Sequence, residues 1–336
     1  MRAMIRHPPP DFDDAQWTKF DPHTDIKTIF MGRLPEVLWY RLRLKVNPAQ
    51  SGLALDEQMI SRAFEVYVNG ERLIAVGRFS PLVLHTLDAR LLRHIPDRMA
   101  ATGGLTIAIR VHISSSEWAG QGPGYFAGNL MLGQWGTLYS ADWLAVIGQH
   151  AFPWLDHLLM IGLGSAALVL FGAQRRQKEF LWIAALGLFT LVESVEPFLA
   201  IFHVFPLHWE IVNDLLRVAT PFLWTSLYFS IVGQRIGWAW RAFLIFAGIM
   251  NAFSGVENLF FNLPLVAQFL TGLPFLVLLS VVIPFILAIH WWRGNREAGI
   301  LLIPALRFSL YIYAKFGFEA MFQFTRSATW RSVVRI

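Results

Sequence analysis

The sequence lacks cysteine altogether and is poor in charged residues. Of its 336 residues, 15% are charged and 55% are hydrophobic, whereas globular chains carry about 25% charged residues. Without cysteine the chain has no disulfide, no thiolate nucleophile and no cysteine-ligated metal. The scarcity of charge excludes a disordered chain and a single soluble domain. The net charge of +5 is not gathered into one patch, so we expect no nucleic-acid partner.

The motifs of common catalytic sites are also missing. The sequence has no His-Glu-x-x-His, no glycine-rich phosphate loop and no nucleophile elbow. It also has no export signal at its start, because Met-Arg-Ala-Met-Ile-Arg is followed at once by prolines instead of an apolar core. We therefore expect no catalytic site, no cofactor and no metal in this chain.

The N-terminal part contains short alternating segments that are typical of strands. The segment 64–68 is followed by Asn69-Gly70, a strong hairpin signal because both residues tolerate positive φ, and a second strand then returns. Further strands are predicted over 39–46, where apolar and basic residues alternate, and over 105–113. Several short strands at this spacing favour a β-sandwich or jelly roll.

Four segments carry a resemblance to a known family: 10–17 (PDFDDAQW), 39–41 (WYR), 64–70 (FEVYVNG) and 105–111 (LTIAIRV). In this order and spacing they resemble the galactose-binding-like jelly roll that precedes β-galactosidase-type hydrolases and forms ectodomains of bacterial sensors. The resemblance covers about residues 8–132. It implies a β-sandwich that binds a ligand, often a sugar, and it does not imply catalysis.

A glycine-rich loop over 114–129 is the predicted ligand site in this region. Flat aromatic faces suit the C–H surfaces of sugars, and nearby polar groups can orient hydroxyls. The alternative is that these aromatics dock the loop on its own domain or on a membrane surface. The candidate residues are Glu117, Trp118, Gln121, Tyr125, Phe126 and Asn129.

Carboxylates near the strands allow simpler interpretations. Asp11, Asp13 and Asp14 suit a cation site, but such residues in a turn more often accept local backbone hydrogen bonds. Glu65 and Glu71 flank the hairpin, and we expect both to be solvated.

Six apolar segments follow, each long enough to cross about 30 Å of hydrocarbon at roughly 1.5 Å per residue. The predicted architecture is thus a β-sandwich (jelly roll) ectodomain followed by an α-helical membrane bundle. Its parts are the ectodomain over 8–132, a juxtamembrane connector over 133–152, the bundle over 153–322 and a tail over 323–336. The predicted spans are 153–173, 180–203, 211–232, 240–261, 265–291 and 299–322.

Basic residues occupy alternate connections between these spans. The connections 203–210 and 258–264 contain no Lys or Arg. Because cytoplasmic loops are enriched in Lys and Arg, the basic connections are predicted in the cytoplasm and the β-domain outside a bacterial inner membrane. The basic residues are Arg175, Arg176, Lys178, Arg235, Arg241, Arg293 and Arg296.

Ionisable residues also lie inside the predicted spans, where they are costly and need partners. One interpretation is a polar network that carries a ligand-driven shift or a proton, and the other is static pairing that fixes helix packing. His203, His208 and Glu210 share one connection, which does not by itself make a metal site. The intramembrane residues are Glu193, Glu196, Asp214, Arg217, Glu257, Arg307, Lys315 and Glu319.

The whole arrangement is similar to that of bacterial seven-transmembrane receptors with diverse intracellular signalling modules. That resemblance rests on architecture and implies a sandwich ectodomain, seven helices and a histidine kinase, cyclase or serine/threonine phosphatase. The seventh helix and the output module are missing here. We therefore expect a chain cut at its start and its end; the alternative is that the first span exports a short upstream domain.

The predicted function is that of a sensor. A small solute, often a carbohydrate in the family resembled, would bind outside, and the helices would relay the change through the segment 128–157 to the missing kinase or phosphatase. The expected partners are the lipid bilayer, this ligand and a second copy in a homodimer. The alternatives are a multi-span transporter or a membrane enzyme with a binding ectodomain. The inverted repeats that favour a transporter are not evident.

Overall fold

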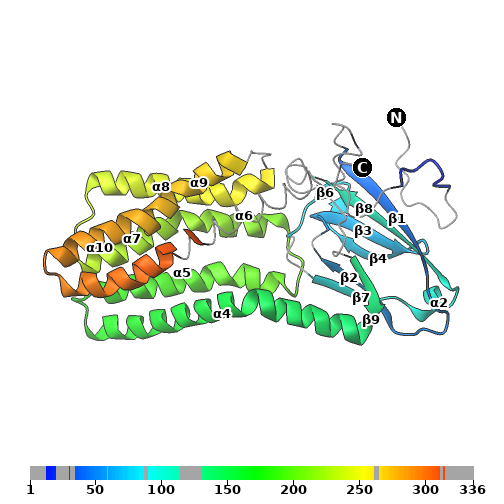
Figure 1. The fold of residues 1–336 in the computed structure, drawn as a ribbon, viewed down its shortest axis with the longest axis horizontal. Coiled ribbons are helices and arrows are strands. Elements are labelled where there is room, and N and C mark those ends of the chain that lie inside the picture. The colour runs from blue at the N-terminus through cyan, green and yellow to red at the C-terminus, as the bar shows by residue number, and fades with distance from the viewer. Residues whose placement is uncertain are drawn as a thin grey trace. The chain divides into compact units, whose positions relative to one another are not determined.

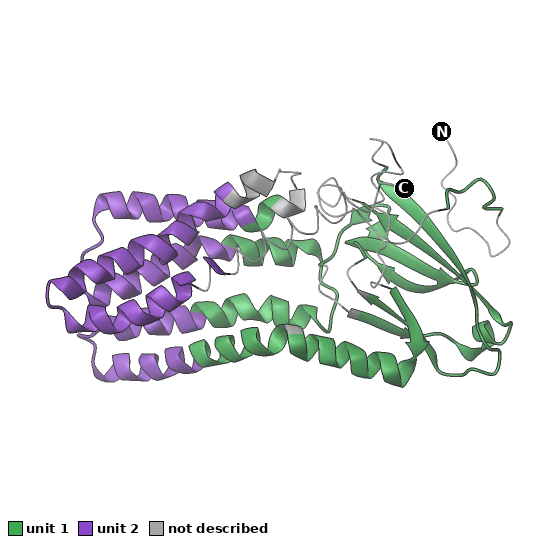
Figure 2. Cartoon of the chain, in the orientation of Figure 1, with its two compact units in different colours: residues 1–161, 189–215, 255–264 green, residues 162–188, 216–254, 265–336 purple. Residues whose placement is uncertain are grey.

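The computed structural model describes most of the chain as two compact units (Figures 1 and 2). Unit 1 holds the β-strands and parts of several helices, and unit 2 holds the other helical segments. The units are residues 1–161, 189–215 and 255–264, and residues 162–188, 216–254 and 265–336. The described residues are 13–19, 30, 35–58, 60–86, 90–113, 130–260, 265–310 and 313–314.

Four antiparallel strands form the larger sheet, here called sheet A. Their order is β1-β8-β3-β4, and each strand pairs with its neighbours in a continuous register apart from one irregularity between β3 and β4. The strands predicted over 39–46, 64–68 and 105–113 are confirmed. The bounds are β1 Val37–Lys45, β3 Ala63–Val68, β4 Glu71–Val76 and β8 Gly104–His112.

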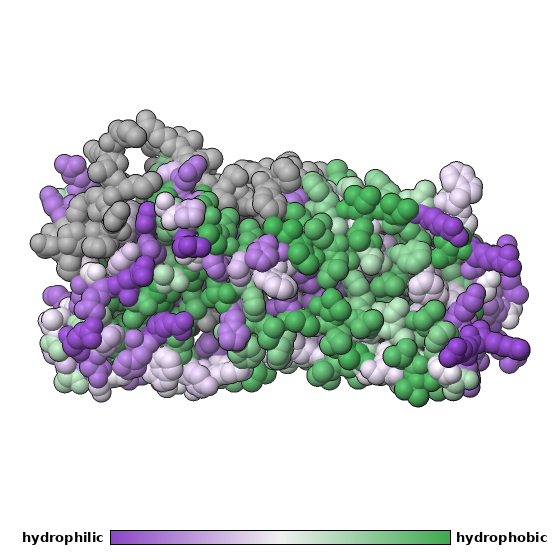
Figure 3. Space-filling model, turned by 180° about the vertical axis from the view of Figure 1, so that it is seen from behind, coloured by the Kyte–Doolittle hydropathy of each residue, from purple (hydrophilic) through white to green (hydrophobic). Residues whose placement is uncertain are grey.

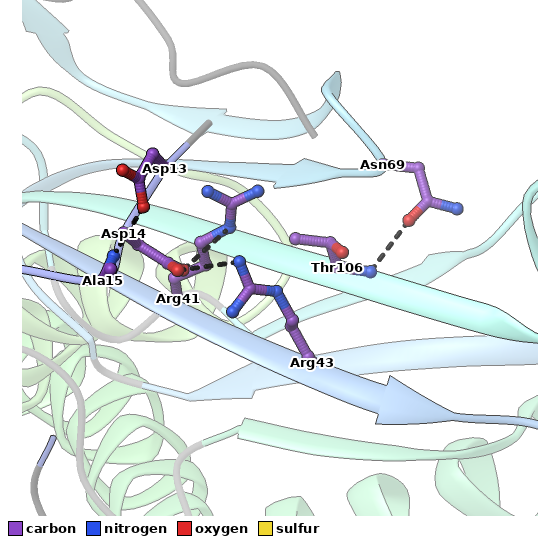
Figure 4. Close-up of polar contacts among 7 residues, drawn as sticks. All are labelled: Asp13, Asp14, Ala15, Arg41, Arg43, Asn69 and Thr106. Carbon is purple, nitrogen blue, oxygen red and sulfur yellow. Dashed lines mark hydrogen bonds and ion pairs between the residues drawn. The ribbon is translucent and has the colours of Figure 1, made fainter. Parts of the chain in front are cut away.

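The predicted Asn-Gly turn joins β3 to β4. Asn69 has φ 49° and Gly70 has φ 85°, so both occupy the left-handed region that this turn requires. The Asn69 Oδ1 atom accepts a hydrogen bond of 2.8 Å from the Thr106 N–H (Figure 4), and its Nδ2 atom donates one of 3.0 Å to the Met99 carbonyl. The turn residue therefore also ties the hairpin to the neighbouring strand.

A second antiparallel sheet, sheet B, consists of strands that the sequence pattern did not single out. Its order is β7-β2-β9. A short hairpin and one turn of helix complete the described part of the domain. The bounds are β2 Leu53–Gln58, β7 Arg90–His94, β9 Leu130–Gln134, β5 Arg78–Phe79, β6 Leu82–Val83 and α2 Asp97–Ala100.

The two sheets bury one shared apolar core. Sheet A contributes Val66, Ile107 and Ile109, and sheet B contributes Leu55 and Leu91. Each fully buried aliphatic side chain contributes about 1.5–3 kcal/mol to folding. The predicted N-terminal β-region is confirmed at this level, as antiparallel sheets around a common core; we call it the β-domain.

The rest of the described chain is helical. α4 starts directly after β9 and runs without interruption through the predicted connector into the first predicted span. The bounds are α4 Trp135–Ala173, α5 Lys178–Ala200, α6 Leu207–Leu216, η1 Arg217–Ala219, α7 Thr220–Ile231, α8 Trp238–Phe260, α9 Leu265–Val277, η2 Leu278–Val282 and α10 Ile283–Trp292. A further helical stretch covers 296–310.

Among the described residues, four helices are long and apolar enough to cross a membrane. They coincide with four of the six predicted spans, and Figure 3 shows hydrophobic residues covering the surface of the helical segments. Of the sixth predicted span, 299–322, only the part up to 310 and residues 313–314 is described. The four are His150–Ala173, Lys178–Ala200, Trp238–Glu257 and Leu270–Trp292.

The third predicted span differs from expectation, because the 3-10 segment η1 divides it into α6 and α7. Pro221 has no N–H to donate to the carbonyl of Arg217, four residues earlier. That carbonyl instead accepts a hydrogen bond of 3.0 Å from Nδ2 of Asn251 in α8. A Cβ at Gly248 would collide with the carbonyl oxygen of Val218. The neighbouring helix α8 therefore accommodates the break, through the donor Asn251 and the close approach at Gly248.

Candidate functional site

All six predicted ligand-binding residues, Glu117, Trp118, Gln121, Tyr125, Phe126 and Asn129, lie outside the described residues. The two ends of their loop are nevertheless placed. Before the loop, the Ile113 N–H donates a hydrogen bond of 2.8 Å to the Glu36 carbonyl. After it, Leu130 pairs with Glu57 of β2. The loop therefore starts from sheet A and returns on sheet B.

Glu57 is a buried carboxyl group that the sequence pattern did not reveal. It is 1% exposed, and neither of its oxygens has a hydrogen-bond partner among the described residues. Burial raises the pKa of Glu57 well above its usual value, and the charge of Asp56 adds to this, whereas Arg93 opposes it. The group therefore favours its neutral form. The alternation of β2 was the available signal, because Glu57 falls on the same face as the core residues Leu53 and Leu55.

Asp13 and Asp14 are both engaged in hydrogen bonds, whereas Asp11 lies outside the described residues. Oδ1 of Asp13 accepts a hydrogen bond of 3.0 Å from the Ala15 N–H, as the turn interpretation predicts. Asp14 accepts a hydrogen bond of 2.8 Å from Arg43 and lies 3.6 Å from Arg41 (Figure 4). The hydrogen bond from Arg43 and the two positive charges lower the pKa of Asp14.

The expectation that Glu65 is solvated was wrong. Its side chain is 15% exposed and lies 3.3 Å from Arg110 and 3.6 Å from Arg72. It also accepts a hydrogen bond of 3.0 Å from the Tyr67 hydroxyl. Burial, followed by this contact with Glu65, raises the pKa of Tyr67 to about 12. Alternation places Glu65 and Tyr67 on the face of sheet A opposite the core, and Arg110 pairs with Glu65 there. Arg72 reaches the same face because the register shifts between Val66 and Tyr67, which sets Arg72 opposite Tyr67.

Glu71 is more exposed, as expected, but it forms a surface pair of 2.5 Å with Arg98. No three His, Asp or Glu side chains converge to hold a metal ion within the described part of the chain.

The β-domain is joined covalently to the helices where β9 ends. Gln134 is the last residue of β9, and Trp135 is the first of α4. The Trp135 N–H donates a hydrogen bond of 2.9 Å to the Gly52 carbonyl, which lies just before β2. Leu138 packs on Gly133, since a Cβ at Gly133 would lie 3.3 Å from its side chain. The helix α4 therefore continues directly from β9, with no flexible linker between them.

A second attachment is made by the turn between α5 and α6, residues 201–206, which belongs to unit 1 with the β-domain. The Thr86 N–H donates a hydrogen bond of 2.8 Å to the Phe205 carbonyl, and the Leu207 N–H donates one of 3.0 Å to the Leu84 carbonyl. His85 and Pro206 thus form an antiparallel β-bridge. Val204 packs against the core of the β-domain.

An ion pair reinforces this second attachment. Both Nη atoms of Arg62 donate to the Glu210 carboxylate, over 2.6 and 3.0 Å. Arg62 is only 7% exposed, and it also donates to the His85 carbonyl over 3.4 Å. Burial lowers the pKa of His85, which favours its neutral form. Of the residues that share this connection, Glu210 therefore forms a bidentate salt bridge to the β-domain.

The same helix carries one of the predicted intramembrane residues. Asp214 follows Glu210 by four residues in α6, which places both on one face of the helix. It is buried, and a Cβ at Gly255 of α8 would lie 2.6 Å from its carboxyl carbon. α6 therefore touches the β-domain through Glu210 and touches α8 one turn further along.

The other predicted intramembrane residues fall into both units. Glu193 and Glu196 are half-buried in α5, and Glu257 is fully buried in α8; with Asp214 they belong to unit 1. Arg217 and Arg307 belong to unit 2, while Lys315 and Glu319 lie outside the described residues.

One polar contact inside the helices was not anticipated. In unit 1, the His157 Nδ1 and Ser194 Oγ atoms lie 2.9 Å apart and join α4 to α5. The four acidic residues of this set that the structure describes are thus grouped with the β-domain and with this contact.

Comparison of the chain with protein-family models, with curated proteins and with solved structures found no match.

Proposed function

We propose that this chain is the membrane-embedded sensor part of a bacterial signal-transduction protein. Its β-domain, a jelly roll outside the inner membrane, binds a small solute such as a carbohydrate, and the helices relay the event to a cytoplasmic kinase or phosphatase. The observation that carries this proposal is the double attachment of the β-domain, through the β9–α4 fusion and through the α5–α6 turn with its Arg62–Glu210 pair.

Double attachment supports signalling because two helices are fixed to different parts of one domain. α4 follows β9 in sheet B, whereas the α5–α6 turn is held by residues 84–86 and Arg62. A ligand that changes the spacing of these parts would move α4 relative to α6. It can do so only by its difference in affinity for the two arrangements.

The placement of the loop 114–129 supports ligand binding by the β-domain. The loop returns to sheet B beside Glu57, a neutral-favouring carboxyl group whose oxygens have no partner in the described part of the chain. The aromatic residues of the loop would stack on the ring of a bound sugar.

The grouping of the connections supports the proposed orientation. The three basic connections belong to unit 2, and the two connections without Lys or Arg belong to unit 1 with the β-domain. The positive-inside rule assigns the first group to the cytoplasm.

The test combines ligand screening with a distance measurement on the full chain in nanodiscs. The fluorescently labelled protein is screened on a glycan array, and Trp118→Ala is expected to lose the binding seen with wild type. Because the chain has no cysteine, spin labels at Phe152→Cys in α4 and Trp209→Cys in α6 report one distance by pulsed electron paramagnetic resonance. The bound glycan is expected to shift this distance, and Arg62→Ala is expected to retain binding but lose the shift.

Two results would contradict the proposal. If no glycan or other small solute binds the wild-type chain, the proposed ligand-binding role of the β-domain is wrong. If a solute binds and the α4–α6 distance distribution does not change, binding is not relayed through the double attachment.

A transporter remains the second candidate because two predicted spans contain non-α segments. η1 divides α6 from α7, and the π-helical η2 divides α9 from α10, and broken helices build substrate sites in many transporters. Uptake of the same radiolabelled glycan into sealed vesicles, above vesicles without protein, would favour this function over sensing.

A further inference from the structure

The helical stretch 296–310 has two faces of different character. One face packs into the apolar core of unit 2, and its members recur at alternating intervals of four and three residues. They are Ala298, Leu302, Ala305 and Ser309, all buried. This face therefore packs against other helices of unit 2.

The opposite face is exposed and carries a single charge. Ile300, Ile303, Arg307 and Leu310 recur at intervals of three, four and three residues, and Ile303 is 71% exposed. Arg307 has no hydrogen bond or ion pair among the described residues. The spacing is that of a seam between packed helices, so the arginine lies in the middle of a surface that is otherwise suited to helix packing.

The position of Arg307 along the helix makes this exposure costly. It follows Arg296 of the basic turn by eleven residues, which corresponds to about 16 Å of helix and about half of a hydrocarbon core of roughly 30 Å. Arginine reaches the interface readily only near helix ends. If 299–322 spans the membrane as predicted, the guanidinium needs an anionic partner at mid-depth.

We propose that this face docks a transmembrane helix of another polypeptide, one that carries an Asp or Glu at mid-depth opposite Arg307. The positive charge of Arg307 favours a partner helix with an Asp or Glu, and Ile300, Ile303 and Leu310 provide the apolar packing surface. A second copy of this chain is a poor occupant, because a two-fold axis through the face would place the two Arg307 side chains together. This inference is independent of the sensor function.

The experiment uses the full chain in phosphatidylcholine vesicles, with a donor fluorophore at Trp292→Cys. The probes are polyleucine transmembrane peptides with one central Glu or Gln and an acceptor at one end. Energy transfer is expected to show about fivefold tighter association of the Glu peptide than of the Gln peptide, in keeping with polar contacts between membrane helices. Arg307→Leu is expected to abolish the preference, whereas Arg307→Lys retains part of it.

Controls separate this result from other causes. Arg293→Leu removes an exposed arginine from the turn and should leave the preference intact. Arg307→Glu should transfer the preference to a peptide with a central Lys. A bimane label at Ile303→Cys, read with brominated lipids, should lie near the bilayer centre.

Several outcomes would overturn the proposal. They are equal binding of the Glu and Gln peptides, loss of the preference when phosphatidylglycerol is added, and a bimane label at the bilayer surface. The second result would mean that a lipid phosphate satisfies Arg307. Energy transfer between labelled copies of the chain that depends on Arg307 would assign the face to self-association instead.

Discussion

At the scale of single residues, the least expected group is Glu57, because it points into an apolar core without a partner in the described part of the chain. A buried carboxyl group that lacks hydrogen bonds costs about 1–3 kcal/mol even when it is neutral, and more when it is charged. Buried groups with a strongly shifted pKa are found mainly at functional sites. Glu57 pairs with Leu130, the first described residue after the predicted ligand loop, so this end of sheet B is a candidate functional region.

The raised pKa of Glu57 gives a pH-dependent stability with a definite sign. In the unfolded chain the group loses its proton near pH 4.3, about the value of an exposed Glu, whereas in the folded chain it does so at a much higher pH. Stability is therefore lost as the pH rises from the unfolded pKa towards the folded one. We predict that Glu57→Gln raises the Tm of the full chain in detergent by about 3–6 °C at pH 8, with a smaller difference at pH 4.

The matched control is Glu71→Gln, at an exposed position on β4. Its Tm difference from wild type should be small at both pH values. A Glu57→Gln variant whose gain is the same at pH 4 and pH 8 would contradict the assigned cause.

At the scale of elements, glycine decides how closely helices approach. A Cβ at Gly164 of α4 would lie 2.6 Å from the Cα of Gly187 in α5, whereas a Cβ at Gly162 would meet nothing within 4 Å. We predict that Gly164→Ala lowers the Tm of the purified chain by about 4 °C or more, since backbone must shift to make room. Gly162→Ala, in the same helix, should leave the Tm unchanged or raise it slightly. Equal effects of the two would show that the α4–α5 contact is not close at this point.

The attachment between the α5–α6 turn and the β-domain is measurable as a coupling energy. We predict that a double-mutant cycle with Arg62→Leu and Glu210→Gln gives about 2 kcal/mol, because the bidentate pair is largely buried. The exposed pair Arg98–Glu71 should give about 0.5 kcal/mol or less in the same assay. Unfolding of the full chain monitored by tryptophan fluorescence provides both values, and additive effects at Arg62 and Glu210 would refute the attachment.

Local sequence patterns predicted the strands and helices better than they predicted the contacts between them. The Asn69-Gly70 turn, the strands beside it and four spans follow from turn chemistry, alternation and length. Sheet B was missed because 53–58 places Asp56 and Glu57 where alternation expects one polar and one apolar residue.

The second attachment was not predictable from any local signal. Arg62 and Glu210 are far apart in the sequence, and Glu210 looked like part of an ordinary loop. Pro221 signalled the division of the third span. The hydrogen bond from Asn251 to the carbonyl that Pro221 leaves free could not be predicted, because Asn251 lies in another helix. The loop aromatics around Trp118 stay a prediction, because they lie outside the described residues.

At the scale of the whole molecule, the orientation in the membrane is the most consequential prediction. The absence of cysteine makes single labels unambiguous. We predict that a membrane-impermeant maleimide applied to intact spheroplasts labels Glu71→Cys on β4, and that Arg175→Cys in the first basic turn reacts only after the membrane is opened. Labelling of both variants in intact spheroplasts would place the β-domain and the basic turn in the same compartment and would refute the proposed topology.

The direct passage from β9 into α4 fixes the rotational phase of the first membrane helix. Each residue added between Gln134 and Trp135 would turn the helix by about 100° and push it along its axis by about 1.5 Å. Insertion of one to seven alanines at this point should therefore change the distance between labels in α4 and α6 periodically, with the helical repeat. A flexible linker in place of this junction would instead give a steady change with the number of inserted residues.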